Sequence, residues 1–130
     1  MNDQERFEFL KETLDRLKSM SATHIFLVEG INDIKALNAV GVDGDFRCIQ
    51  STGGPIKAAE YVWQQGKEAV ILTDWDRKGG IIARDLRENL AALDVRYDDR
   101  IRADLSFICK PFVKDVESVD KVYALLESKV

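Results

Sequence analysis

Acidic residues follow two apolar segments of this 130-residue chain. The apolar run 69–72 leads to Asp74 and Asp76, and the apolar run 25–28 leads to Glu29. Residues i and i+2 of an extended chain point the same way, so we expect Asp74 and Asp76 to present both carboxylates to one spot. Two adjacent carboxylates are costly unless a positive charge lies beside them. The natural partner is a hard cation such as Mg²⁺.

The acidic positions can converge only if the strands before them are neighbours. In a parallel sheet the carboxyl ends of neighbouring strands meet at one edge, which would bring Glu29 to Asp74 and Asp76. Three carboxylates plus water describe a site for one or two Mg²⁺ ions, with Mn²⁺ as a substitute. Such ions clamp a phosphate and stabilise charge on the attacking and leaving oxygens. The competing interpretation is that these aspartates are turn residues or helix caps.

Several other residues could contact a substrate phosphate. A glycine turn precedes Pro55, where a helix is expected, and free backbone N–H groups at a helix start bind phosphate. Glycine beside the acidic residues leaves room for a phosphate, and basic side chains nearby could add charge or be simply solvated. The candidates of these kinds are Gly30, Thr52, Gly53, Gly54, Lys57, Arg77 and Lys78.

The elements that must position these residues alternate between strand and helix. A continuous apolar strand such as 24–28 is typical of a parallel sheet buried on both faces. The pattern predicts a three-layer α/β fold with a mostly parallel four-stranded sheet flanked by helices. An amphipathic helix within residues 1–22 is expected to pack on a domain formed by 23–130. The expected strands are 24–28, 46–49, 69–73 and 105–109, and the expected helices are 3–19, 33–40 (capped by Asn32), 55–65, 81–93 and 116–126.

Composition and charge exclude several classes of protein. The chain is 45% hydrophobic and 32% charged, with a net charge of −4, which argues against a basic coat for nucleic acid but not against an enzyme that acts on it. No apolar run approaches the roughly 20 residues of a membrane span, and the first residues are too polar for a signal peptide. Cys48 and Cys109 lie in separate apolar segments, which favours reduced thiols and a cytoplasmic location. His24 is the only histidine, so histidine-based triads are excluded.

Two motifs resemble those of the toprim domain. The first is Val28-Glu29-Gly30 followed by Asp33, and the second is Thr73-Asp74-Trp75-Asp76 with Gly79-Gly80. The resemblance covers roughly residues 24–118. Toprim domains occur in topoisomerases, bacterial primases, recombination-repair proteins and small stand-alone nucleases. This chain looks most like the small archaeal toprim proteins, and it is similar to the toprim part of the nuclease that matures 5S ribosomal RNA.

The resemblance implies a role for each matching residue. Glu29 would be the general acid/base or a ligand of the first metal ion. Asp74 and Asp76 would coordinate Mg²⁺, with Asp74 placed to bridge two ions. Asp33 matches a position that is often acidic in the nuclease branch and joins the possible substrate contacts. Glu117 looks like an acidic residue near a helix start in the 5S ribosomal RNA nuclease.

Three functional hypotheses follow. The first is Mg²⁺-dependent cleavage or transfer of phosphodiesters on RNA or DNA, since a lone toprim domain could be a nuclease or a subunit completed by a protein partner. The second is a non-catalytic module that binds nucleic acid or protein through Mg²⁺. The third is a phosphoacceptor receiver domain, in which Asp74 would be phosphorylated and Lys110 would end a later strand.

Overall fold

The computed structural model describes residues 1–130 and contains one four-stranded sheet. The strands are β1 (His24–Val28), β2 (Asp45–Cys48), β3 (Glu68–Ile71) and β4 (Tyr97–Asp98). All three strand pairings are parallel and the strand order is β2-β1-β3-β4, so the α/β fold is confirmed and the sheet is wholly parallel. The strand β1, which leads to Glu29, is therefore a direct neighbour of β3, as convergence requires.

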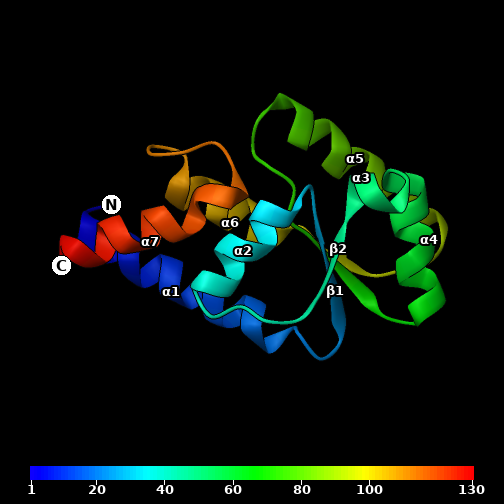
Figure 1. The fold of residues 1–130 in the computed structure, drawn as a ribbon, viewed down its shortest axis with the longest axis horizontal. Coiled ribbons are helices and arrows are strands. Elements are labelled where there is room, and N and C mark those ends of the chain that lie inside the picture. Colours follow the sequence, from blue (N-terminus) through cyan, green and yellow to red (C-terminus); the bar gives the residue numbers. More distant parts are fainter.

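Helices cover both faces of the sheet. They are α1 (Asp3–Ser19), α2 (Ile31–Ala39), α3 (Ile49–Thr52), α4 (Pro55–Gln65), α5 (Arg77–Ala92), α6 (Arg100–Cys109), the 3₁₀ turn η1 (Val116–Ser118) and α7 (Val119–Ser128). Figure 1 shows β1 and β2 between the helices α1, α2, α6 and α7 on one side and α3, α4 and α5 on the other. In β1, Phe26 and Val28 pack with α1, α2, α6 and α7, whereas Ile25 and Leu27 pack with α4 and α5. The continuous apolar run in β1 is thus explained by burial on two faces. No helix combines the length and the apolar character needed to cross a membrane.

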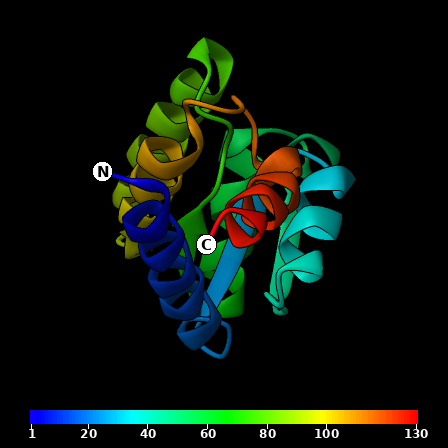
Figure 2. The ribbon, with the colours of Figure 1, turned by 90° about the vertical axis from the view of Figure 1, so that its left-hand side faces the viewer.

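Helix α1 packs lengthwise on the domain against α6 and α7. It begins with a capping box, in which the Asn2 side chain accepts from the Glu5 N–H at 2.8 Å and the Glu5 side chain accepts from the Asn2 N–H at 3.1 Å. Its apolar face, which includes Leu10 and Leu14, is fully buried. Figure 2 shows α1 in blue beside α7 in red, with the two chain ends close together.

The prediction of a strand at 105–109 is wrong, because this segment is the end of helix α6. The buried residues Ile101, Leu105 and Ile108 recur at helical spacing, which the short apolar run alone did not reveal. The fourth strand is instead β4, which pairs with β3 and lies in a charged stretch where no element is expected from the sequence.

Two helix starts also differ from the expectation. Helix α2 is capped at Gly30 rather than at Asn32, because the Asp33 side chain accepts from the backbone there. Helix α5 begins at Arg77 rather than at residue 81, so the glycine pair lies in its first turn. Strand β3 ends at Ile71, although the Leu72 N–H still donates to the Leu27 carbonyl at 2.9 Å. Residues 72–76, which we call the acidic turn, therefore lie between the short strand β3 and the long helix α5.

Candidate functional site

Glu29 and Asp74 meet at the carboxyl edge of the sheet. Glu29 directly follows β1, and the Asp74 N–H donates to Glu29 Oε2 at 2.7 Å. Both residues are half-buried, so their carboxylates are shielded from bulk water but can be reached. The structure thus brings together two of the three carboxylates that the sequence predicted to converge.

Asp33 joins this pair from the first turn of α2. Its side chain is buried, and Oδ2 accepts from the N–H groups of Glu29 and Gly30, each at 3.1 Å. Burial raises the pKa of Asp33, the two backbone donors oppose this, and the negative charges of Glu29 and Glu117 raise it further. Asp33 therefore fixes the turn that carries Glu29 and adds a third carboxyl to the same edge.

Asp74 has the most perturbed carboxyl in this cluster. Burial raises its pKa to about 7, and the charges of Glu29 and Asp33 and a hydrogen bond with the Glu29 side chain also raise it. The Val116 N–H, which donates to Asp74 Oδ1 at 2.9 Å, opposes this shift. Near neutral pH the Asp74 carboxyl therefore gains or loses a proton readily, which is a property of acid/base sites.

Asp76 does not join the pair by any hydrogen bond but caps helix α5. Its Oδ1 accepts from the Gly79 N–H at 2.7 Å, and its side chain is exposed. The carboxylates that raise the pKa of Asp74 are Glu29 and Asp33, and Asp76 is not among them. The structure assembles no group of three or more His, Cys, Asp or Glu side chains that could by itself hold a metal ion.

The glycine turn before α4 differs from its predicted role. Gly53 and Gly54 both have positive φ, at 113° and 98°. Their N–H groups donate to the carbonyls of Gln50 and Ile49, so the expectation that these amides are free for a phosphate is wrong. The Thr52 hydroxyl likewise donates to the Cys48 carbonyl. The donors of Thr52, Gly53 and Gly54 are therefore used within the turn that connects α3 to α4.

The basic candidates behave differently from one another. Lys57 lies 3.6 Å from Glu60 in an ion pair on α4. Arg77 and Lys78 are exposed in the first turn of α5, directly after Asp76, and neither forms an ion pair. They are the only two of the predicted contacts that place a free positive charge beside the acidic turn.

Arg102 is a site residue that the sequence reasoning did not identify. It comes from α6, and it donates to the carbonyls of Thr73 (3.0 Å) and Asp74 (2.6 Å). Burial, followed by the neighbouring Arg87, lowers the pKa of Arg102, while the nearby acidic residues oppose this. The only sequence signal was a charged stretch with three arginines between 96 and 102.

The loop between α6 and η1 also supports the acidic turn. The Trp75 indole N–H donates to the Val113 carbonyl at 2.9 Å, and the Trp75 backbone N–H donates to the Lys114 carbonyl at 3.3 Å. Together with the bond from Val116 to Asp74, these contacts join the acidic turn to the loop at three points. The position of Asp74 therefore depends on residues 113–116.

Replacing Arg102 with alanine is expected to destabilise the protein by about 2 kcal/mol, because it removes two hydrogen bonds from a charged donor to half-buried carbonyls. Arg102→Lys should be intermediate, since one ammonium cannot match a fork that bonds both carbonyls. Urea unfolding would measure both changes. The matched control is Arg100→Ala, because the Arg100 side chain is exposed and its ion pair with Asp104 should contribute less than about 1 kcal/mol. Equal losses for Arg100→Ala and Arg102→Ala would contradict the role of Arg102.

Comparisons with known proteins identify relatives along most of the chain. No family model matches the chain. A UPF0292 protein of Methanocaldococcus jannaschii is 31% identical over 119 residues, which are 92% of this chain and 93% of that protein. A UPF0292 protein of Methanosarcina acetivorans is 34% identical over 125 residues, which are 95% of this chain and 86% of that protein. A solved structure of a protein from Aquifex aeolicus, 25% identical, superposes with a TM-score of 0.68 over 83% of this chain and 95% of that one. The chain belongs to the UPF0292 family.

Proposed function

We propose that the protein binds Mg²⁺ through Glu29 and Asp74 and catalyses phosphodiester cleavage or transfer on nucleic acid. The observation that carries this proposal is the half-buried pair of carboxyls at the ends of two neighbouring parallel strands, where the pKa of Asp74 is raised to about 7. The carboxyl edge of a parallel sheet is the usual place for a ligand in such folds.

The residues at this edge fit a hard cation. The half-buried Arg102 lies near enough for its charge to interact with Glu29 and Asp74, but it donates to backbone carbonyls, so no cationic side chain binds the carboxylate oxygens directly. Mg²⁺ is typically held by one or two carboxylates, waters and substrate phosphate oxygens rather than by a complete protein cage. Two converging carboxylates without a third protein ligand match this mode of binding.

Each residue of the site then has a defined task. A bound Mg²⁺ would stabilise negative charge on the phosphate oxygens. Glu29 is placed to accept or donate a proton at this edge, because its half-buried carboxylate accepts from the Asp74 N–H and lies beside the Asp74 carboxyl. Asp33 orients Glu29 through the backbone, and Arg102 fixes the carbonyls of the turn that carries Asp74. Arg77 and Lys78 are free to contact the phosphate.

The toprim resemblance supports the same chemistry. A glutamate after the first strand and an aspartate after its neighbouring strand are the features from which the resemblance implied a nuclease-like site. In that interpretation Asp76 would be a further Mg²⁺ ligand, and its exposed side chain leaves an oxygen that is not used by the helix cap. A protein partner that completes the site remains part of the proposal.

The other two hypotheses are distinguishable from this one. A non-catalytic module would bind Mg²⁺ and nucleic acid through the same residues without turnover. The receiver hypothesis requires Lys110 at the end of a strand, whereas Lys110 follows the last residue of helix α6. The structure therefore lacks one of the two features that motivated the receiver hypothesis, and the other, Asp74 after a buried strand, is shared with the proposed metal site.

The test is a Mg²⁺ and Mn²⁺ titration by calorimetry, with and without an oligonucleotide, followed by a cleavage assay on structured RNA and DNA. Glu29→Gln and Asp74→Asn should each lower cleavage at least about 100-fold, which is the scale of lost acid/base catalysis. Asp43→Asn, an exposed aspartate elsewhere on the chain, is the matched control. Metal binding without cleavage would favour the non-catalytic module, and no metal binding even with the oligonucleotide would overturn the proposal.

A further inference from the structure

Two hollows adjoin each other at the start of α7. The first is polar, has a volume of about 290 Å³ and lies between α2 and η1–α7. The charged residues in its wall are Lys35, Glu117, Asp120 and Lys121. The second is largely apolar, has a volume of about 410 Å³ and is lined by Phe112 and Leu125 among others. Lys121 lines both hollows, so the two form neighbouring parts of one surface.

This surface begins at the acidic edge. Glu117 belongs to η1, which packs against α2, and Asp33 lies in the first turn of that helix. Val113, which lines the apolar hollow, accepts the hydrogen bond from the Trp75 indole, next to Asp74. Both hollows therefore adjoin the acidic edge, the polar one through Glu117 and the apolar one through Val113.

Unpaired lysines concentrate around this path. Four of the ten lysines form ion pairs, namely those at 11, 18, 57 and 129. Five of the other six lie on α2, at the start of α5 or within residues 110–121, and only Lys67 lies elsewhere, at the amino end of β3. In a chain with a net charge of −4, such a group of free cations favours a polyanion as the occupant.

The apolar hollow adds a place for a flat aromatic ring. Phe112 is 37% exposed and Leu125 is 40% exposed, although both are large hydrophobic residues. The Arg6 guanidinium lies 5.9 Å from the centre of the Phe112 ring and adds a further cation beside it. Lysines along a backbone path beside an exposed aromatic ring are the combination that binds single-stranded nucleic acid.

We propose that the substrate is single-stranded nucleic acid that runs from the acidic pair past Lys35 and Lys121 into the apolar hollow, where an unpaired base stacks on Phe112. This inference rests on the proposed function and names its substrate class. A duplex does not fit, because its paired bases have no free face to place against Phe112. The free lysines favour a phosphate backbone over an apolar protein segment.

The test measures binding by fluorescence anisotropy of labelled 20-nucleotide RNA and DNA, each single-stranded and annealed, in EDTA. The protein carries Asp74→Asn, which removes the chemistry and the negative charge of that side chain. Phe112→Ala should weaken single-strand binding about 10-fold. Lys121→Ala should lower the slope of log K against log salt by about 0.7.

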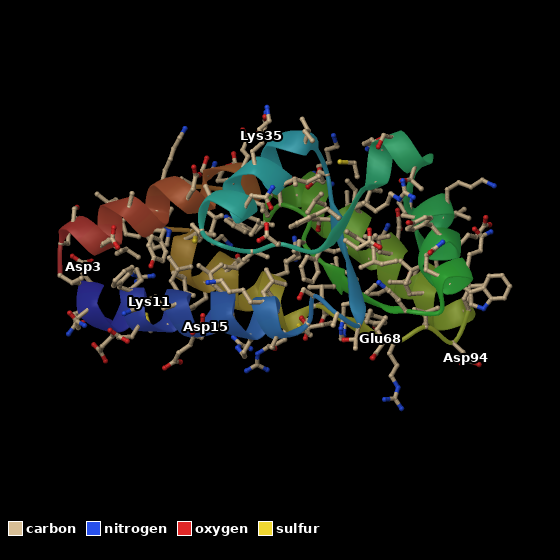
Figure 3. The ribbon with its side chains drawn as sticks, turned by 60° about the horizontal axis from the view of Figure 1, so that its bottom comes forward. Asp3, Lys11, Asp15, Lys35, Glu68 and Asp94 are labelled. Carbon is tan, nitrogen blue, oxygen red and sulfur yellow. The ribbon has the colours of Figure 1, made fainter.

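The matched controls lie near the amino end of β3, away from the carboxyl edge that carries Glu29 and Asp74. Trp63→Ala and Lys67→Ala remove an exposed aromatic residue and a lysine there, and neither should change binding. Figure 3 shows Lys35 projecting from α2, whereas Glu68, the neighbour of Lys67, lies on the other side of the molecule. Because Lys121 is exposed, Lys121→Glu should fold normally and provides a second variant with a larger expected loss.

The outcomes separate this inference from the proposed function. Single-strand binding that weakens in the Phe112 and Lys121 variants supports the surface even if no cleavage is found. Cleavage by the parent that is lost in Asp74→Asn but unchanged in the Phe112 and Lys121 variants keeps the function and overturns the surface. Equal binding of duplex and single strand, or no binding, also overturns it and leaves the apolar hollow to a protein partner.

Discussion

Gly79→Ala is expected to destabilise the protein by at least about 3 kcal/mol, the upper range of overpacking in a closed site. A Cβ at position 79 would lie 1.8 Å from the carbonyl oxygen and 2.5 Å from the carbonyl carbon of Asp74. Neither atom is the end of a flexible side chain, so the backbone of the acidic turn must move. Gly79 also accepts from the Thr73 hydroxyl at 2.8 Å and donates to Asp76, so both contacts would be disturbed.

Gly80→Ala is the matched control for Gly79→Ala. It places the same methyl group one residue later in α5, where no atom lies within 4 Å of the added Cβ. Alanine is a better helix former than glycine, so this variant should gain about 0.5–1 kcal/mol. Thermal unfolding of the two variants would show the contrast, since 1 kcal/mol corresponds to roughly 4 °C for a domain of this size. Similar melting temperatures would contradict the close approach of α5 to Asp74.

The same contact is expected to link stability to metal binding. If Gly79→Ala folds, the displaced Asp74 backbone should also disturb the bonds to Arg102 and Glu29. Calorimetry should then show weaker Mg²⁺ binding in Gly79→Ala and unchanged binding in Gly80→Ala. The glycine at 79 is thus needed by the acidic turn itself and not only by the helix that follows it.

Residues with strong local signals could be placed from the sequence. The helices α1 and α4 and the strand β1 have the predicted bounds, because an amphipathic period, a proline at a helix start and a doubly buried apolar run are local features. The prediction that Glu29 and Asp74 approach each other followed from the rule that parallel strands end at one edge. That prediction needed no knowledge of side-chain packing.

Contacts between distant segments could not be read from the sequence. Arg102 reaches the Asp74 carbonyl across 28 positions, and the Val116 N–H reaches the Asp74 carboxylate across 42. Asp76 adopts the competing interpretation: aspartate is strongly preferred as a helix cap, and this local role takes one of its oxygens. The preference of aspartate for a helix cap therefore outweighs the alternation of an extended chain, which predicts that the side chains of Asp74 and Asp76 point the same way.

Asp74→Asn is expected to stabilise the metal-free protein at pH 8 and to change it little at pH 4. The pKa of Asp74 is 3.8 in an unfolded chain and about 7 in the folded protein, so the folded state holds the proton more tightly. The contribution of protonated Asp74 to the free energy of unfolding is fully present below pH 4 and is lost as the pH rises through 7. The amide cannot ionise and still offers an oxygen to the Val116 N–H. Allowing for partial solvent screening, we expect a gain of about 2 kcal/mol at pH 8.

Urea unfolding at the two pH values would measure this effect, with Asp76→Asn as the control. Asparagine is also a good helix cap, and Asp76 is exposed, so this variant should change stability little at either pH. A gain for Asp74→Asn that is equal at pH 4 and pH 8 would contradict the electrostatic cause, because the charge on Asp74 would then not be the destabilising feature.

Magnesium should reverse the order of stability of the parent and the Asp74→Asn variant. An ion that binds only the folded state adds about 2.7 kcal/mol to the parent at 100 times its dissociation constant, and it adds little to Asp74→Asn if Asp74 is a ligand. The variant that is more stable without metal at pH 8 should therefore lose its advantage in excess Mg²⁺. Equal stabilisation of both proteins would place the ion elsewhere. The repulsion between carboxylates that destabilises the metal-free protein would then have no role in binding metal. Glu29 and Asp74 would be structural residues of the turn that follows β3.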